Sequence, residues 1–205
     1  MVGSWNVKIN TSGMPQKVAT AIGALAEQLM GAEYEPIAYL GSQVVNGTNH
    51  AVLAKQTILS GRDTTNVVVL IFNEKPNDMK ATLISIERVV EGGAPLGGIH
   101  VDPKIEIPAD AKEAWDTAFA NFVGSKVEPA ALLATQVVNG VNYIFVAEIA
   151  PLVPNAVSKV VLVTVNPTAG TLSFADLLES KHESSLDYAF TWLKGGLGKP
   201  LGEWP

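Results

Sequence analysis

Cysteine is missing altogether from the 205 residues of this sequence. Its absence excludes disulfide bonds, zinc sites built from thiolates and a cysteine nucleophile. Basic residues are also scarce, because 14 lysines and arginines stand against 20 aspartates and glutamates, for a formal net charge of −6. Since phosphate recognition needs a basic surface, we expect no nucleic-acid partner.

Long apolar runs are missing too. No uninterrupted run reaches the roughly 20 apolar residues that a membrane-spanning helix needs. Residues 1–6 show neither the basic nor the apolar region of a signal peptide. We therefore expect no membrane partner and a cytoplasmic location, with which the lack of cysteine agrees.

The sequence also lacks the common signatures of enzymes. There is no Gly-x-Ser-x-Gly motif, and the glycine-rich segment 195–199 is followed by Pro200 where a Walker motif needs Ser or Thr. The histidines, His50, His100 and His182, do not have the spacing of metal ligands on a helix. We expect no enzymatic activity, no metal and no cofactor.

What the sequence does contain is an internal repeat. Gln-Val-Val-Asn-Gly occurs at residues 43–47 and again at 136–140, an offset of 136 − 43 = 93. At the same offset, residues 15–55 and 108–148 share 14 identities in 41 positions. One structural unit was therefore used twice.

Each copy predicts a helix followed by strands. In residues 15–30, apolar side chains at Val18, Ile22, Leu25 and Leu29 form one stripe, and Gly31 follows as a stop signal. The corresponding positions of the second copy are Trp115, Ala118 and Phe122, with Gly124 as the stop. Strand-like runs follow at 36–45, 50–60, 67–72 and 81–90. Asn-Gly between two such runs predicts a hairpin with a type I′ turn.

A helix with one apolar stripe must lie across one face of a curved sheet. We therefore predict an α+β fold with two tandem units, each with one helix packed across an antiparallel sheet of about four to five strands. The unit boundaries are placed at residues 1–91 and 92–180, joined by a segment rich in Gly and Pro. Residues 181–205 form a C-terminal extension that is apolar enough to pack on the second unit.

Each copy opens with a short arm of small residues, Gly3-Ser4 in the first and Gly97-Gly98 in the second. With this arm, the helix and the hairpin in order, the sequence resembles the cystatins, which inhibit papain-like cysteine proteases. Their hallmark is a Gln-x-Val-x-Gly hairpin after a long N-terminal helix, and both copies contain it. Among cystatins, the chain is most similar to the stefins, which lack disulfides and signal peptides. The resemblance covers about residues 1–90 and 95–178. Neither second turn has the Trp that follows Pro in many secreted cystatins.

The resemblance implies a papain-like cysteine protease as the partner and three contact segments in each unit: an N-terminal glycine arm, the first hairpin and the second hairpin. In the first unit the implied contacts are Gly3, Ser4, Gln43, Val44, Val45, Asn46, Gly47, Lys75 and Pro76. In the second unit they are Gly97, Gly98, Gln136, Val137, Val138, Asn139, Gly140, Asn166 and Pro167.

The valines of the pentapeptide are the decisive residues in this prediction. Val44-Val45 and Val137-Val138 are expected to be exposed at hairpin tips, where an apolar surface is unusual unless a partner covers it. The structural alternative remains open, because Asn-Gly favours hairpins and valine favours strands in any protein. The alternative function is a non-inhibitory interaction or scaffold protein that retains the cystatin fold.

Overall fold

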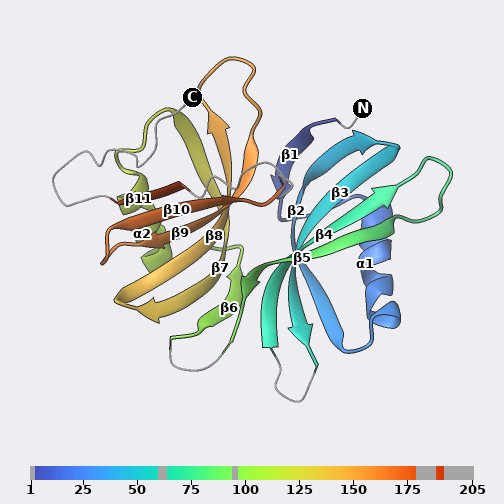
Figure 1. The fold of residues 1–205 in the computed structure, drawn as a ribbon, viewed down its shortest axis with the longest axis horizontal. Helices are drawn as coiled ribbons and strands as arrows, with labels where there is room; N and C mark the ends of the chain where they lie inside the picture. Colours follow the sequence, from blue (N-terminus) through green and yellow to red (C-terminus); the bar gives the residue numbers. More distant parts are fainter. Residues whose placement is uncertain (1–2, 60–63, 94–96, 179–187, 192–205) are drawn as a thin grey trace. The chain divides into compact units, whose positions relative to one another are not determined.

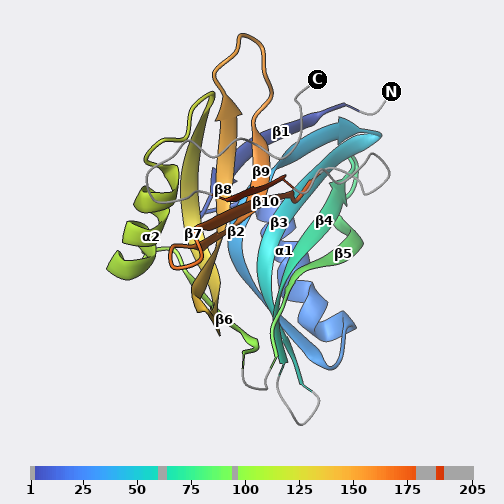
Figure 2. The ribbon, with the colours of Figure 1, turned by 60° about the vertical axis from the view of Figure 1, so that its left-hand side comes forward.

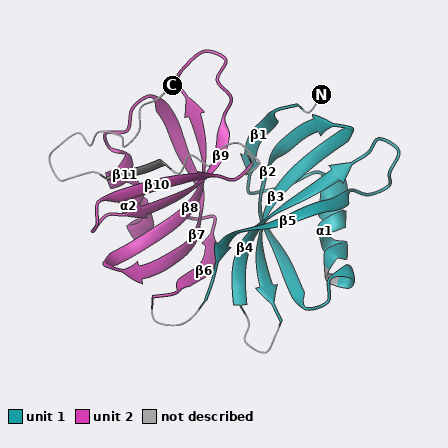
Figure 3. Cartoon of the chain, in the orientation of Figure 1, with its two compact units in different colours: residues 1–93 teal, residues 94–205 magenta. Residues whose placement is uncertain are grey.

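The structure is a computed structural model that describes residues 3–59, 64–93, 97–178 and 188–191. The chain divides into two compact units, residues 1–93 and 94–205 (Figure 3), close to the boundary after residue 91 placed from the sequence. Each unit combines one described helix with an antiparallel sheet (Figure 1). The α+β class and the two helix-and-sheet arrangements were therefore predicted correctly.

The first unit has one helix and five strands among its described residues. They are β1 (Trp5–Asn10), α1 (Gln16–Gln28), β2 (Ala32–Val45), β3 (Gly47–Ile58), β4 (Thr64–Glu74) and β5 (Thr82–Glu91). The strands follow one another across the sheet in sequence order, and every neighbouring pair is antiparallel. Figures 1 and 2 both show α1 lying along one face of this sheet.

The second unit repeats this order and adds a strand. Its described elements are β6 (Ile99–Lys104), α2 (Ala109–Phe119), β7 (Ser125–Val138), β8 (Gly140–Pro151), β9 (Lys159–Asn166), β10 (Thr171–Asp176) and β11 (Tyr188–Thr191). β11 pairs with β10 and is the outermost strand on that side of the sheet. The predicted extension at 181–205 lies outside the described residues apart from β11.

The apolar stripe of α1 packs where the sequence predicts. Val18, Ile22 and Leu25 are buried and share a core with Leu70 and Phe72 of β4. The helix begins after Pro15, whose φ of −55° and ψ of 136° are those of an N-cap residue rather than of the first helical turn. Burial of these side chains contributes about 1.5–3 kcal/mol each.

The core of the second unit is built from aromatic rings. Trp115 is buried, stacks on Phe119 at a centroid distance of 4.3 Å and meets the edge of Phe145 at 5.0 Å. Phe122 lies beyond the end of α2 and packs partly buried against the same core. No helix among the described residues has the length and apolar character needed to cross a membrane.

Candidate functional site

Three segments of each unit meet at one end of its sheet. In the first unit, the β2–β3 hairpin and the β4–β5 connection lie at this end, because alternate connections of consecutive antiparallel strands return to the same side. β1 also starts here, since Trp5 pairs with Gln43. We define the edge of unit 1 as residues 3–4, 43–47 and 75–81, and the edge of unit 2 as residues 97–98, 136–140 and 167–170.

The N-terminal arm is held against the hairpin by hydrogen bonds. The amide of Gly3 donates to the carbonyl oxygen of Val44 at 3.0 Å, and Gln43 Nε2 donates to the carbonyl oxygen of Gly3 at 2.9 Å. In the second unit, Gln136 Nε2 donates to the carbonyl oxygen of Gly97, also at 2.9 Å. The structure therefore brings the predicted arm and first hairpin together in both units. Next to these contacts, Ser4 is exposed and Gly98 is partly buried.

The valines at the two tips are not equally accessible. The exposed fraction is 70 % for Val44, 71 % for Val137 and 46 % for Val138, whereas Val45 is half-buried. The prediction of two exposed valine pairs is therefore right for three of the four side chains. Neighbouring residues of a strand point to opposite faces of its sheet, so Val45 faces away from the side that exposes Val44.

Glycine at the hairpin tip has a specific structural reason. Gly47 has a φ of +102°, which side chains disfavour, and a Cβ there would lie 2.5 Å from the carbonyl oxygen of Glu74. Gly140 has a φ of +87°, and a Cβ there would collide with the side chain of Thr168. Close approach of the next segment, as well as the backbone turn, therefore requires glycine.

The predicted type I′ turn is wrong. Such a turn needs positive φ at both central residues. Asn46 and Asn139 precede the two glycines and are exposed at the tips, but the only non-glycine residue with positive φ in the described ranges is Asn155.

A chain of side-chain amides crosses the edge of unit 1. Asn73 Nδ2 donates to Asn49 Oδ1 at 2.8 Å, Asn49 Nδ2 donates to Gln43 Oε1 at 3.1 Å, and Gln43 Nε2 donates to Gly3. The three amides are directly opposite one another on β4, β3 and β2. Every amide in this chain donates in the same direction, toward the arm.

The second unit contains the same chain. Asn166 Nδ2 donates to Asn142 Oδ1 at 2.9 Å, Asn142 Nδ2 donates to Gln136 Oε1 at 2.9 Å, and Gln136 donates to Gly97. Asn166 Nδ2 also lies 3.2 Å from the carbonyl oxygen of Asn139, and its Oδ1 accepts from the amide of Ala169 at 2.8 Å.

These amides correct part of the predicted contact set. Gln43, Gln136 and Asn166 were predicted as direct protease contacts, but their side chains bond within their own unit, and Asn166 is only 2 % exposed. Asn166 is the last residue of strand β9, and Asn73 is the second-last residue of strand β4. Asn166 therefore supports the edge rather than forming its surface, whereas Gln43 and Gln136 are partly exposed and stay predicted contacts.

The second turns of the two units differ. Lys75 and Pro76 are exposed, as a contact segment should be, and the adjoining Met79 is 95 % exposed. In unit 2 the turn is shorter, Pro167 is half-buried, and Thr168 lies against Gly140 of the first hairpin. This turn supports its own hairpin.

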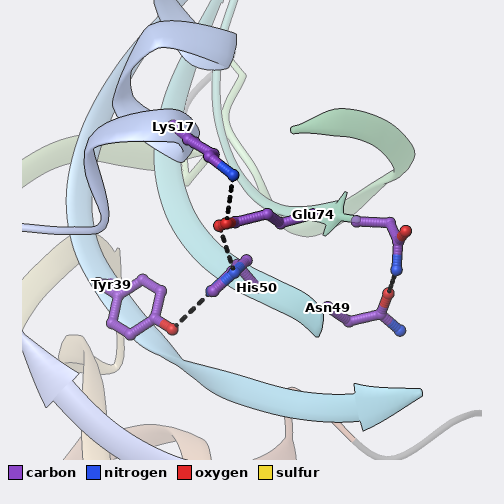
Figure 4. Close-up of polar contacts among 6 residues, drawn as sticks. Lys17, Tyr39, Asn49, His50 and Glu74 are labelled. Atoms are coloured by element: carbon purple, nitrogen blue, oxygen red, sulfur yellow. Dashed lines mark hydrogen bonds and ion pairs between the residues drawn. The ribbon is translucent and has the colours of Figure 1, made fainter. Parts of the chain in front are cut away.

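A charged cluster lies beneath the edge of unit 1 (Figure 4). Lys17 Nζ of α1 pairs with Glu74 Oε1 at 2.8 Å, and Glu74 Oε2 lies 3.4 Å from Nε2 of the buried His50. The other ring nitrogen, Nδ1, is 2.9 Å from the hydroxyl of Tyr39. Burial lowers the pKa of His50 against the opposing effect of Glu74, and the hydrogen bond from Lys17 lowers the pKa of Glu74.

The second unit replaces this cluster with a single hydrogen bond. At the offset of 93, Tyr143 stands for His50 and Asp110 for Lys17, and the Tyr143 hydroxyl donates to Asp110 Oδ2 at 3.1 Å. Burial, with Asp110 as a smaller cause, raises the pKa of Tyr143. This pair has no histidine, so His50 beneath the edge of unit 1 has no counterpart at this place in unit 2.

Sequence reasoning missed the positioning residues Asn49, Asn73 and Asn142. The signal was present, because Asn49 and Asn73 recur as Asn142 and Asn166 at the offset that aligns Gln43 with Gln136. Polar side chains repeated within apolar strands indicate a shared hydrogen-bond network. Across the described part of the chain, no three His, Asp or Glu side chains are grouped as metal ligands.

Comparison with known proteins gives no relative. The chain matches no family model, and no curated protein or solved structure shows significant similarity to it.

Proposed function

We propose that this chain is a tandem, cystatin-like inhibitor of papain-like cysteine proteases, in which the edge of each unit blocks the active-site cleft. The observation that carries the proposal is the exposed valine at a fixed hairpin tip, found twice. Val44 and Val137 are 70 % and 71 % exposed, although each is paired with the neighbouring strand of its hairpin. Exposed apolar side chains do not stabilise the free chain, whereas their burial against a partner stabilises the complex.

The order of elements supports the proposal. A first strand, a helix across the sheet and a sheet in sequence order bring arm, first hairpin and second turn to one end. A cleft lined with apolar subsites is blocked by a narrow, apolar and rigid surface of this kind. Because both arm and hairpin are already hydrogen-bonded, little ordering entropy is lost on docking.

Blocking the cleft requires no chemistry from the inhibitor. The backbone of Gly3 and Gly97 lies beside the hairpin, so the arm can follow the cleft by close approach of the main chain. Val44 and Val137 then fill apolar subsites. The protease nucleophile is covered without being offered a peptide bond in position for attack.

The test is a titration of papain with the full chain and with two single variants. Val44→Asp and Val137→Asp put a charge where an apolar subsite is expected, and each should weaken binding of its own unit at least about thirtyfold. Both side chains are exposed, so the free energy of unfolding should change by less than about 0.5 kcal/mol.

The matched controls are Leu59→Asp and Leu152→Asp. These side chains are 50 % and 71 % exposed and lie at the opposite end of their sheets, after β3 and β8. They should leave inhibition unchanged. If the wild-type chain does not slow papain at micromolar concentration, the inhibitor proposal is rejected, and the non-inhibitory interaction or scaffold protein becomes the better interpretation.

A further inference from the structure

The amide chain of each unit has a direction that matters. Along it, each NH2 group faces the oxygen of the next amide, and the last donor is the Nε2 group of Gln43 or Gln136. A primary amide can serve such a chain in only one orientation at a time. Turning one amide over would place two oxygens or two NH2 groups face to face, so a reversal at one end must propagate to the other.

Glycine arms need this support because they have no side chain to anchor them. The arm of unit 1 is held by its own amide and by the donor from Gln43. A side chain at Gly3 would not fit well, because its Cβ would lie 3.1 Å from the carbonyl oxygen of Val44. The glycine therefore permits close approach, and the amide chain supplies the attachment.

We propose that Gln43-Asn49-Asn73 and Gln136-Asn142-Asn166 are positioning devices that hold each N-terminal arm on its hairpin before a target arrives, and so slow the release of that target. The effect on release rests on the proposed function, whereas the hold on the arm does not. An arm that is already in place loses less conformational freedom on binding, and most affinity differences within one interface appear in the dissociation rate.

The decisive variant is Asn49→Asp, which nearly preserves the shape of the side chain. A carboxylate still accepts from Asn73 but has no hydrogen to donate to Gln43. Gln43 then turns its NH2 group toward the new carboxylate and withdraws it from Gly3. In this variant both neighbouring amides keep a hydrogen bond to the carboxylate, and the carbonyl oxygen of Gly3 loses its donor.

Asn73→Asp tests the relay itself. Three hydrogen bonds, through Asn49 and Gln43, separate its side chain from the carbonyl oxygen of Gly3. The carboxylate would draw the NH2 group of Asn49 toward it, and Gln43 would reverse in turn. A purely local role for Gln43 would leave the arm unchanged in this variant.

The matched control is Asn10→Asp. Asn10 is exposed at the end of β1, and its Oδ1 accepts from the amide of Ser12, which an aspartate oxygen does equally well. The change of charge is the same, but the amide chain is untouched.

The first measurement is hydrogen exchange at the amide of Gly3 in the full chain. We expect about a five- to tenfold increase in Asn49→Asp and in Asn73→Asp, as loss of one hydrogen bond implies, and no change in Asn10→Asp. In both variants of unit 1, the resonances of Gly97 in unit 2 should stay as in the wild type. Asn142→Asp should shift the resonances of Gly97 and leave those of Gly3 unchanged. Unchanged exchange at Gly3 in Asn49→Asp overturns the positioning role, whatever the chain does to papain.

The second measurement is the release of papain from unit 1, observed alone in a Val137→Asp background. Asn49→Asp should raise the dissociation rate roughly tenfold and leave the association rate within about twofold. Faster exchange at Gly3 with an unchanged dissociation rate overturns the effect on release. If the wild-type chain does not bind papain at all, the proposed function fails, and the exchange data still decide whether the amides hold the arm.

Discussion

The two units support the same edge on different cores. The stripe of α1 is aliphatic at Val18, Ile22 and Leu25, whereas the corresponding stripe of α2 has Ala111, Trp115 and Ala118. One large ring thus stands where three aliphatic side chains share the space. Cores tolerate such exchanges when the total volume is kept. The comparison shows that the edge does not depend on the identity of the side chains beneath the helix.

The polar residues near the edge divide into two kinds. The amide chain has the same residue types and hydrogen bonds in both units, with distances between 2.8 and 3.1 Å. The charged cluster around His50 exists in unit 1, and Tyr143 with Asp110 takes its place in unit 2. The amides are therefore part of the shared device, while the cluster of Lys17, Glu74 and His50 belongs to unit 1.

The second turns add a further difference. In unit 1 the exposed Lys75 and Met79 extend the edge, whereas in unit 2 Thr168 lies against Gly140. Under the proposed function, unit 1 offers a protease three contact segments, and unit 2 relies mainly on its arm and first hairpin.

The largest expected effect comes from breaking the aromatic core of unit 2. Trp115→Ala removes the ring that stacks on Phe119 and meets Phe145, and it should lower the free energy of unfolding of unit 2 by about 3–5 kcal/mol. Ile22→Ala at the corresponding site of unit 1 should cost about 2–5 kcal/mol. Hydrogen exchange of peptides from each unit separates the two effects. A smaller loss in unit 2 than in unit 1 would show that the aromatic cluster is not its main support.

A smaller effect is expected at the hairpin tips. Gly47→Ala and Gly140→Ala both place a side chain at positive φ, a strain of about 1–3 kcal/mol. The neighbours differ, because the new methyl group meets the backbone of Glu74 in unit 1 and the side chain of Thr168 in unit 2. Gly47→Ala should therefore cost more, measured by urea unfolding of the full chain.

Thr168→Gly provides the control for this comparison. It removes the atoms that a methyl group at Gly140 would meet, so it should recover part of the loss caused by Gly140→Ala. No side-chain truncation can do the same for Gly47→Ala. If both glycine variants cost the same and Thr168→Gly recovers nothing, backbone strain alone explains the two glycines.

Much of this fold could be predicted because its signals are local. The stripe at Val18, Ile22 and Leu25 predicts a helix with one buried face, and the structure confirms it. The repeat at an offset of 93 predicts that the second copy folds alike. The added strand β11 follows a segment without a counterpart in the first copy, so the repeat gave no signal for it.

The roles of individual edge residues were harder to predict. Which amide faces which depends on the register of three strands, and a shift of one residue would turn Asn49 to the other face of the sheet. Asn166, which is buried, was therefore taken for a surface contact. Likewise, Asn46-Gly47 alone suggested a type I′ turn, but Asn46 does not have the positive φ that such a turn requires.

The smallest expected effect is a difference in acid sensitivity. Burial lowers the pKa of His50 below its ordinary value of 6.5, so the unfolded chain takes up this proton first as the pH falls. The contribution of His50 is complete above pH 6.5 and is lost as the pH falls through the lower pKa of the folded state. The pKa of Glu74 is lowered from 4.5, mainly by Lys17, so its contribution disappears at still lower pH.

Unit 1 should therefore lose stability as the pH falls below 6.5, and unit 2 should lose less there, because Tyr143 replaces the histidine. Hydrogen exchange of peptides from each unit measures both curves in one sample. His50→Gln should flatten the curve of unit 1 in this range, whereas His100→Gln, at an exposed position on β6, should leave it unchanged. A slope that persists in His50→Gln would assign the acid sensitivity to other groups and remove the charged cluster as a functional difference between the units.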